Sequence, residues 1–379
     1  MSHFWKPYAD PQFVSAIAQF TAEHVTPQGD RIDAEDVYPT AILKELAARG
    51  LSSVTLPRSY GGQQRSFLEA AALFEEVSVG SAAVGVSLIS TFQAQTLIRL
   101  FGSDTLKERY LPQFCQGMLG AFALTEANHG SDIRSLDTKG VLEDGQWRLD
   151  GEKSFITSAS AAELFVVLAE TPSGVSTFAI PRDTAGARLY EGSNSATFGL
   201  RNGPHLNLVL ENVRVPADHL IGVEGKGVRQ AVTTLDYSRT LAAAISVGIA
   251  RAAFDAALRY TSGRSAFDRK VLEFQGIQWY FADLLAEIDA ARLLVYEAAR
   301  ALDTHDDIDR YGSGAKLFAS EVATRVASQA VQVCGAHGVQ QNTPFGRYLR
   351  DAKAYEIAGG SKEVLKNTLG KYLLKRVAA

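Results

Sequence analysis

The sequence predicts a mainly α-helical protein with a β domain in the middle of the chain. In residues 1–120, apolar residues recur three or four positions apart, which is the period of an amphipathic helix. From about residue 121 to 222 the chain changes to short β-rich runs, separated by turn sequences such as Asp-Gly, Pro-Ser-Gly and Asn-Gly. After Gly225 long helical patterns return.

Three units are expected from this order, because 379 residues exceed one ordinary hydrophobic core. They are an N-terminal helical domain (1–120), a β domain (121–225) and a C-terminal four-helix bundle (226–379). Helices are expected at 11–25, 38–49, 66–79, 103–113, 226–262, 272–302, 313–334 and 360–376. Strands are expected at 165–168, 177–180 and 206–210, and they should form an antiparallel barrel or sandwich.

Charge and cysteine content exclude several classes of protein. The net charge is −4 and no basic stripe is present, so neither nucleic acid nor an anionic membrane is an expected partner. Cys115 and Cys334 lack metal-ligand spacing, and two lone thiols favour a reducing cytoplasm. Residues 1–6 show no signal peptide, and the uncharged stretch 77–97 is polar enough to predict a buried helix pair instead of a membrane span.

Five stretches carry a resemblance to a known family. They read Leu-Thr-Glu-Ala-Asn-His-Gly-Ser-Asp (124–132), Lys-Ser-Phe-Ile-Thr (153–157), Arg-Ser-Ala-Phe with a later Gln (264–267, 275), Gln-Val-Cys-Gly-Ala-His-Gly (332–338) and Tyr-Leu-Arg-Asp-Ala-Lys (348–353). In this order, and within this succession of helical, β and helical regions, they resemble the acyl-CoA dehydrogenase family of flavoproteins. The implied cofactor is FAD.

The resemblance implies two sets of FAD-binding residues. The first set lies in or beside the β domain and comprises Phe122, Leu124, Thr125, Gly130, Ser131, Phe155 and Thr157. Strand alternation should place Phe155 and Thr157 on one face, where a ring and a hydroxyl would meet the flavin. A Gly-Ser turn can also present backbone N–H groups to a phosphate.

The second set lies in the C-terminal helices and comprises Arg264, Phe267, Gln275, Gln332, Gly335, Ala336, Ser361 and Glu363. Arginine suits a phosphate and phenylalanine suits an adenine face. In the family the segment that carries Arg264 and Phe267, together with the 332–338 loop, reaches the FAD of a neighbouring subunit, so the resemblance implies a homodimer or homotetramer. Ser131, Asp236 and Arg239 are implied to contact substrate, although an i,i+3 ion pair is an equally good interpretation of Asp236 and Arg239.

The catalytic base of the family is missing from both of its known positions. The usual Tyr-Glu-Gly-Thr is here Ala-Gly-Gly-Ser, so Gly359 stands where the family carries its glutamate. The alternative position, one residue before Arg239, holds Ser238, which is no base at neutral pH. Glu356 is a weak candidate, because it should point elsewhere on its helix. A missing base predicts severely impaired α,β-dehydrogenation, since a positioned base contributes roughly 10²–10⁴ in rate.

The expected function is therefore an atypical FAD-dependent oxidoreductase acting on an acyl thioester. Arg201 followed by His205 resembles members that act on carrier-protein-bound acyl groups in polyketide pathways, so acyl-CoA and acyl-ACP stay equally open. The electron acceptor would be a flavoprotein or O2. Two alternatives remain: a flavin monooxygenase of the same superfamily, and a non-catalytic subunit that completes the FAD site of an active paralogue.

Overall fold

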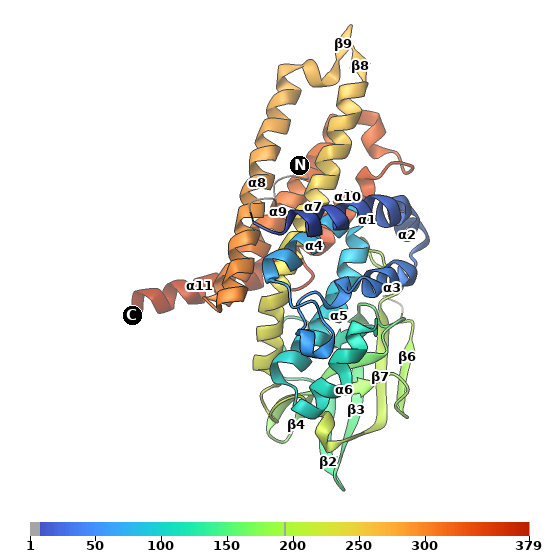
Figure 1. The fold of residues 1–379 in the computed structure, drawn as a ribbon, viewed down its shortest axis with the longest axis vertical. Coiled ribbons are helices and arrows are strands. Elements are labelled where there is room, and N and C mark those ends of the chain that lie inside the picture. The colour runs from blue at the N-terminus through green and yellow to red at the C-terminus, as the bar shows by residue number, and fades with distance from the viewer. Residues whose placement is uncertain (1–7, 193–194, 379) are drawn as a thin grey trace.

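The computed structural model describes residues 8–192 and 195–378. The residues on which the expectation about a signal peptide rests lie outside this range. The N-terminal part is helical (Figure 1), with α1 (Pro11–Phe20), α2 (Gly29–Glu35), α3 (Thr40–Ala48), α4 (Phe67–Gly80), α5 (Ala82–Phe101) and α6 (Asp104–Cys115).

Helix starts in this region follow from local sequence signals. Asp10 caps α1 by accepting from the N–H of Gln12, and Pro11 occupies the first turn, where no N–H partner is needed. A reciprocal capping box begins α4: the Ser66 hydroxyl accepts from the Glu69 N–H at 3.2 Å, and the Glu69 carboxylate accepts from the Ser66 N–H at 3.1 Å. These caps fix the residues at which α1 and α4 begin.

The β domain consists of seven strands. They are β1 (Gly120–Ala123), β2 (Lys139–Glu143), β3 (Gln146–Ile156), β4 (Leu164–Thr171), β5 (Gly174–Pro181), β6 (Ala187–Tyr190) and β7 (Leu206–Pro216). The order along the sheet is β1-β4-β2-β3-β7-β6, and β5 pairs with β4. A separate apolar core fills this domain, with Trp147, Phe165 and Phe178 among its largest members.

The expectation of an antiparallel sheet is wrong at one edge. β1 pairs in parallel with β4, and the single pairing between β2 and β4 is also parallel. Parallel neighbours need a long crossover, and β2 and β3 with their flanking loops supply it between β1 and β4. The remaining pairs are antiparallel.

Long helices make up the C-terminal part. They are α7 (Gly227–Gly263), α8 (Gln275–Thr304), α9 (Ile308–Val333), α10 (Phe345–Tyr355) and α11 (Lys362–Ala378), with a short hairpin β8 (Ser265–Ala266) and β9 (Arg269–Lys270) and the 3-10 helix η7 (Gly335–Val339). Helices α7, α8 and α9 pack on one another, and α10 packs on α7 and α9. The expected fold class is confirmed, while the four-helix bundle stays a prediction.

Helix α7 runs through the middle of the molecule. It is long and apolar enough to cross a membrane, but 83% of its apolar window is buried inside this fold, as expected of a core helix. It packs against α4 and α5, which form the buried helix pair predicted for 77–97. One continuous apolar core therefore joins the N-terminal and C-terminal helices.

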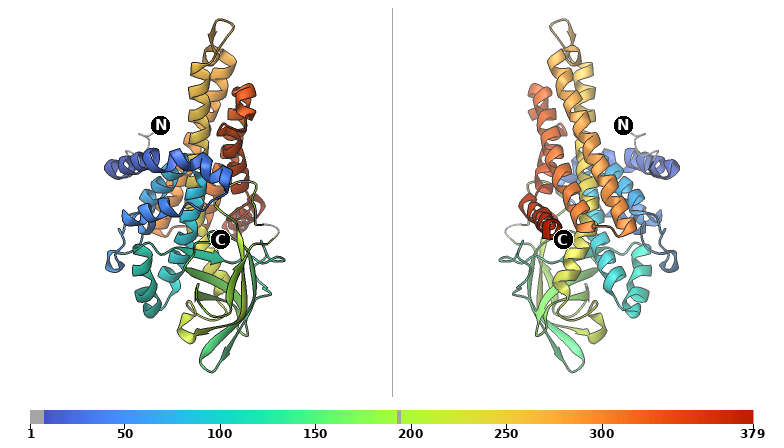
Figure 2. Two further views of the ribbon diagram at one scale, coloured as in Figure 1. Left: turned by 90° about the vertical axis from the view of Figure 1, so that its right-hand side faces the viewer. Right: turned by 90° about the vertical axis from the view of Figure 1, so that its left-hand side faces the viewer.

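The molecule is elongated, with different domains at its two ends. The β8–β9 hairpin forms one tip, at the end of α7 and α8, and the β domain forms the other (Figure 1). The two views at right angles show the same separation (Figure 2). Residues on the hairpin and residues on the sheet are thus far apart within one chain.

Candidate functional site

The first set of predicted site residues meets where β1 ends beside β3. Phe122 is the third residue of β1, and Leu124 and Thr125 follow the strand; all three are half-buried. The Ser154 N–H donates to the Thr125 carbonyl at 2.9 Å, and Lys153 Nζ donates to the Leu124 carbonyl at 3.3 Å. Two of the motifs recognised in the sequence are therefore joined side by side.

A buried ion pair holds this junction together. Lys153 Nζ lies 2.6 Å from Glu126 Oε1, and both side chains are enclosed. Burial lowers the pKa of Lys153 to about 8 although Glu126 opposes it. Burial alone raises the pKa of Glu126, but hydrogen bonds from Lys153 and Thr138 outweigh it and lower the pKa. His129 and Asp137 lie near enough to share a cation with Glu126, yet the Glu126 oxygens already accept several hydrogen bonds, so we assign no metal here.

Phe155 lies in a bulge at the end of β3. Its φ is +56°, in the left-handed region, and the pairing of β3 with β7 shifts between Lys153 and Ile156. The expected regular alternation is therefore wrong: Phe155 departs from it, and Thr157 lies in the turn after the strand. The bulge leaves the Phe155 side chain 47% exposed, and Gly130 and Ser131 are exposed in the preceding loop.

The second set begins at the far tip of the molecule. Arg264 directly follows α7, Phe267 forms the turn of the β8–β9 hairpin with φ +53°, and Gln275 begins α8. Phe267 is 89% exposed. An uncovered aromatic ring of this size on a left-handed turn is costly in a free surface loop, which favours a partner for it.

Gln332, Gly335 and Ala336 lie near the same tip. They are exposed at the end of α9 and in η7. The His337 ring stacks on Tyr260 with centroids 4.3 Å apart, and the Arg264 N–H donates to the Tyr260 carbonyl. Most of the second set therefore gathers around the end of α7. Within one chain it does not meet the first set at the β domain (Figures 1 and 2).

Asp236 and Arg239 form a buried ion pair on α7. Arg239 Nη1 donates to Asp236 Oδ1 at 2.6 Å. The two residues therefore form the i,i+3 ion pair that was one of the two interpretations of the sequence. Burial raises the pKa of Asp236 to about 6, against the opposing charge of Arg239. Arg239 Nε is enclosed without a hydrogen-bond partner among the described residues. The pair therefore retains a donor for a group that the chain itself does not supply.

The loop after α10 lies against Arg239. A Cβ on Gly360 would be 3.5 Å from Arg239 Nη2, while a Cβ on Gly359 would meet no atom within 4 Å. The φ angles of Gly359 and Gly360 are +72° and +112°, which glycine adopts most readily. Ser361 follows as the half-buried residue before α11, and Glu363 is exposed in its first turn.

Lys316 of α9, which no sequence motif marks, holds this loop. Its Nζ donates to the Gly360 carbonyl at 2.7 Å and to the Glu356 carbonyl at 3.3 Å, and the side chain is fully buried. Burial, aided by the charge of Arg239, lowers the pKa of Lys316 to about 7. The only sequence signal for it is its position directly after the small-residue run at 312–315.

Helix α5 connects the β domain to the α7 residues. The Ser90 hydroxyl donates to the carbonyls of Thr157 at 3.1 Å and Gly120 at 3.3 Å. One turn later, Gln93 Nε2 donates to Ser238 Oγ at 3.1 Å. The β1–β3 junction, the Ser238 position and the loop beside Arg239 thus belong to one neighbourhood.

His205 does not join this neighbourhood. Its Nε2 lies 3.2 Å from Asn202 Oδ1, and Asn202 in turn donates to Ser87 at 2.8 Å. Burial lowers the pKa of His205, which favours the neutral ring. The loop that carries it is anchored where Asp351 accepts from the Leu200 N–H. The histidine is therefore part of a structural network.

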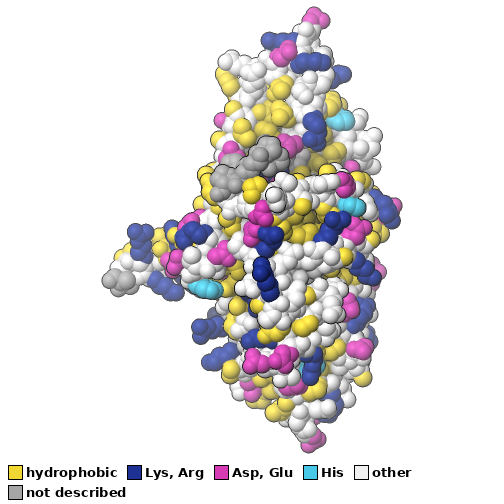
Figure 3. All heavy atoms as spheres, in the orientation of Figure 1, with side chains coloured by type: hydrophobic (Ala, Val, Ile, Leu, Met, Phe, Trp, Pro, Cys, Tyr) yellow, Lys and Arg dark blue, Asp and Glu magenta, His cyan; other side chains and the backbone are white. Residues whose placement is uncertain are grey.

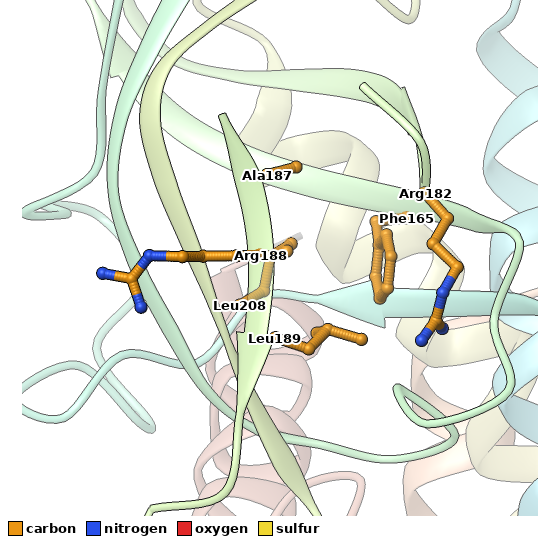
Figure 4. A pocket seen from close by; sticks show the side chains of 6 residues that line it. All are labelled: Phe165, Arg182, Ala187, Arg188, Leu189 and Leu208. Carbon is orange, nitrogen blue, oxygen red and sulfur yellow. The ribbon is translucent and has the colours of Figure 1, made fainter. Parts of the chain in front are cut away.

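Two hollows lie away from these residues. One, of about 220 Å³, is on the β domain (Figure 4); its Arg182 already donates to the carbonyls of Ala159 and Ala162, and Arg188 points the other way. The other, of about 710 Å³, lies between α2 and the segment from η7 to α10. Its Arg350 is paired with Asp33. None of the residues assigned to the FAD or substrate sets lines either hollow, although Arg201 and Gly338 of the sequence motifs line the second.

Family models for the three domains of acyl-CoA dehydrogenases match nearly the whole chain. The N-terminal model covers residues 9–118, the middle model 121–213 and the C-terminal model 225–374. This chain belongs to the acyl-CoA dehydrogenase family. The resemblance carried by the five sequence stretches is confirmed.

Relatives and solved structures match this chain over nearly its full length. An acyl-CoA dehydrogenase of Bacillus subtilis is 34% identical over 365 residues, 94% of this chain and 96% of that protein. The structure of butyryl-CoA dehydrogenase from Megasphaera elsdenii superposes with a TM-score of 0.93 at 32% identity, covering 96% of this chain and 97% of that one. A prolyl acyl carrier protein oxidase superposes with a TM-score of 0.91 at 26% identity, covering 96% and 98%.

FAD is the cofactor of acyl-CoA dehydrogenases, and the residues present here fit it. Phe155 at the end of β3 and Phe267 in the β8–β9 turn are large, exposed apolar rings on left-handed backbone. Such faces suit the two aromatic ring systems of a flavin dinucleotide, and Arg264 suits its phosphates. The chemistry of the donor set is therefore that of a flavoenzyme.

Proposed function

We propose that this chain is an FAD-dependent oxidoreductase that acts on an acyl thioester without the glutamate base of its family. FAD, when bound, supplies the two-electron acceptor of the reaction. The proposal rests on the loop beside Arg239. There Gly359 leaves open space and supplies no acidic side chain. The other positions considered for a base are also unsuitable, for separate reasons.

The Ser238 hydroxyl is hydrogen-bonded to two neighbouring residues. It accepts from Gln93 and donates to the Leu235 carbonyl at 3.1 Å, and the side chain is buried. A hydroxyl with an ordinary pKa far above neutrality needs an adjacent base before it can take a proton. No carboxylate or imidazole among the described residues is hydrogen-bonded to it. The Ser238 hydroxyl can therefore orient its neighbours, but it cannot act as the base that removes a proton from the substrate.

The Glu356 carboxylate is paired with two lysines. Its Oε2 lies 2.7 Å from Lys353 Nζ and 3.8 Å from Lys362 Nζ. Burial raises the pKa of Glu356, but these contacts outweigh it and the net shift is downward. A carboxylate with a lowered pKa is a weaker base than a free one. This arrangement supports the expectation that Glu356 is not catalytic.

The consequence is a site that binds an acyl thioester but removes its α-proton poorly. Loss of a positioned base costs roughly 10²–10⁴ in rate, and water does not replace it for so weakly acidic a proton. The natural substrate must then lower this barrier itself, for example by losing carbon dioxide from a malonyl-type thioester. Both CoA and an acyl carrier protein are proposed as carriers, since relatives include dehydrogenases of acyl-CoA and an oxidase named for a carrier protein.

A homo-oligomer is proposed because the β8–β9 hairpin, which carries Phe267, lies at one tip of the molecule, away from the β domain (Figures 1 and 2). Apolar residues also line the outer face of α8, where Trp279 is 62% exposed and Leu293 is 48% exposed. Hydrophobic side chains are visible over the helical end of the molecule (Figure 3). A second copy that covers this face would bring its own hairpin to the flavin.

We also propose a cytoplasmic location, with a flavoprotein or O2 as electron acceptor.

Anaerobic stopped-flow reduction of the bound flavin tests the proposal. Purified protein should be yellow, should not be a monomer, and should be bleached very slowly by butyryl- or octanoyl-CoA. Bleaching at ordinary dehydrogenase rates would show that another residue is the base. Hydroxylated product from reduced flavin and O2 would favour a monooxygenase, and copurification with an active paralogue would favour a non-catalytic subunit.

A further inference from the structure

The smaller hollow, on the β domain, is a gap in the wall of the curled sheet. Strand β6 comes last in the strand order, so one of its edges has no neighbouring strand in the part of the chain that the structure describes. The hollow lies between this strand and Arg182, the residue directly after β5, and has a volume of about 220 Å³. It therefore opens onto the apolar core of the β domain.

The floor of the hollow is apolar. Phe165 of β4 and Leu208 of β7 lie deep in the core, and the half-buried Leu189 of β6 points across the gap toward Phe165 (Figure 4). A protein cavity of about 150 Å³ holds benzene, so this hollow has room for the body of a molecule of roughly eight or nine carbons. The surroundings thus suit an apolar group and not a sugar or a nucleotide.

Arg182 places a positive charge beside this apolar floor (Figure 4). Its Nη1 donates to the carbonyls of Ala159 at 2.9 Å and Ala162 at 3.0 Å. Among the described residues, no hydrogen bond or ion pair engages its Nε or Nη2, and none of the six residues that line the hollow is acidic. Arg188 points away from the hollow and pairs with Glu211 at 2.7 Å. A guanidinium with unused donors binds a carboxylate through parallel hydrogen bonds.

The two carbonyls that Arg182 holds belong to the turn between β3 and β4. This turn begins directly after Thr157, which the sequence assigns to the flavin. Ser158 has a φ of +67°, and its carbonyl accepts the Ala162 N–H at 2.9 Å. The turn is therefore a tight, left-handed one whose shape depends on contacts from outside it. A ligand that fixes the Arg182 side chain would also restrict this turn.

We propose that the hollow binds a monocarboxylate with an apolar body of roughly eight carbons, with its carboxylate on Arg182, and that binding stiffens the turn after Thr157. The site is separate from the loop beside Arg239, and the inference goes beyond the proposed function. It gives the β domain a regulatory site for a free carboxylic acid. Because coupling between two sites is reciprocal, bound carboxylate and bound FAD should strengthen each other.

Hydrogen-exchange mass spectrometry of the full-length, FAD-loaded protein with octanoate tests the site. Octanoate should slow exchange in residues 157–162 and 182–189, and the dependence on concentration gives a Kd. Octanamide has the same length without the charge and should bind roughly tenfold more weakly. Unchanged exchange in both segments at saturating octanoate would overturn the proposal, and equal affinity for octanamide would overturn the role of Arg182. No thioester is present, so the result does not depend on the proposed reaction.

Three variants assign the response to residues. Leu189→Trp should fill the hollow and abolish the effect of octanoate, while Arg182→Gln should abolish it by removing the charge. Arg188→Gln is the matched control, because Arg188 lies on the same strand as Leu189 but points away, so the response should persist. An unchanged response in Arg182→Gln would place the ligand elsewhere and overturn the proposal. Equal loss in Arg182→Gln and Arg188→Gln would overturn it too, because a general effect of surface charge would then explain the binding.

Discussion

Lys316 Nζ donates a hydrogen bond of 2.7 Å to the carbonyl oxygen of Gly360. The lysine belongs to α9 and the glycine to the loop between α10 and α11, where the sequence resemblance places the base of the family. The same amine reaches the Glu356 carbonyl, so it joins both ends of the turn after α10. A glycine-rich loop thereby acquires a fixed shape from a single buried side chain.

The first prediction concerns the pH dependence that this lysine imposes. Its pKa is about 7 in the folded chain and 10.5 ordinarily, so between these values the unfolded state holds a proton that the folded state has lost. Stability contributed through Lys316 therefore rises as pH increases from about 7 to 10, by at most about 1.4 kcal/mol per pH unit. Urea unfolding should show this rise in wild type and its loss in Lys316→Met. The exposed Lys44→Met variant should follow wild type.

The second prediction restores an acid to the loop. Gly359→Glu should speed flavin reduction by butyryl-CoA roughly tenfold to a hundredfold, short of a fully positioned base. Space is available, but φ +72° strains any residue with a Cβ, at a cost of about 1 kcal/mol in stability. Gly359→Gln has the same strain and nearly the same size without the carboxylate. If stopped-flow traces accelerate equally in both variants, a base is not the cause.

The third prediction concerns the alternative position. Ser238→Glu should rescue less than Gly359→Glu, because Ser238 is 2% exposed and the larger side chain displaces Gln93. Overpacking of this kind costs roughly 1–3 kcal/mol, which should appear as a lower Tm. Ser238→Gln isolates the packing cost from the charge. A rate gain in Ser238→Glu above that of Gly359→Glu would contradict this order.

Much of the fold was predictable because it depends on local patterns. The helical periods placed α4, α6, α7 and α8 within a few residues of their observed bounds. The parallel pairing of β1 with β4 was not predictable, because strand partners separated by a long crossover leave no mark in either strand. The left-handed Phe155 was missed for a related reason: bulges depend on the neighbouring strand, which a single sequence does not reveal.

The site was predictable where a motif exists and not where only burial matters. Phe122, Thr125 and Thr157 were named from motifs, and the structure brings their segments together. Lys316 was missed, because a lone cation in a helix usually denotes a solvated face. Only the fold shows that it is enclosed against a glycine loop.

A fourth prediction addresses the buried charge network behind the site. Arg251 Nη1 lies 2.7 Å from Glu75 and 2.6 Å from Glu76, and Arg292 shares Glu75 at 2.8 Å. Burial alone raises the pKa of Glu75, but the two arginines outweigh it and lower the pKa. Arg251→Met leaves buried carboxylates uncompensated and should destabilise the fold by about 3–5 kcal/mol. Removal of the exposed Arg325, which pairs with Glu287, should cost under about 1 kcal/mol in the same denaturation assay.

The last prediction follows from the separation of the two sets of FAD-binding residues. Arg264→Ala, at the hairpin tip, and Ser131→Trp, in the β-domain loop, should each yield protein that retains little FAD. Both positions are exposed, so neither variant should lose its fold. Co-expression of the two variants should restore FAD binding and yellow colour. In a mixed oligomer, the intact β domain of one chain meets the intact hairpin of the other, so one site of each mixed pair is complete, while its second site carries both defects.

The recovered flavin, counted per chain by absorbance after tandem-tag purification of the mixed species, should approach one FAD per two chains. Co-expression of Arg264→Ala with a tagged copy of itself is the control and should stay colourless. If one chain supplied the whole site, every chain in the mixture would carry a defect and no flavin would return. Such a result would contradict the shared site, and the exposed Phe267 would then need another explanation.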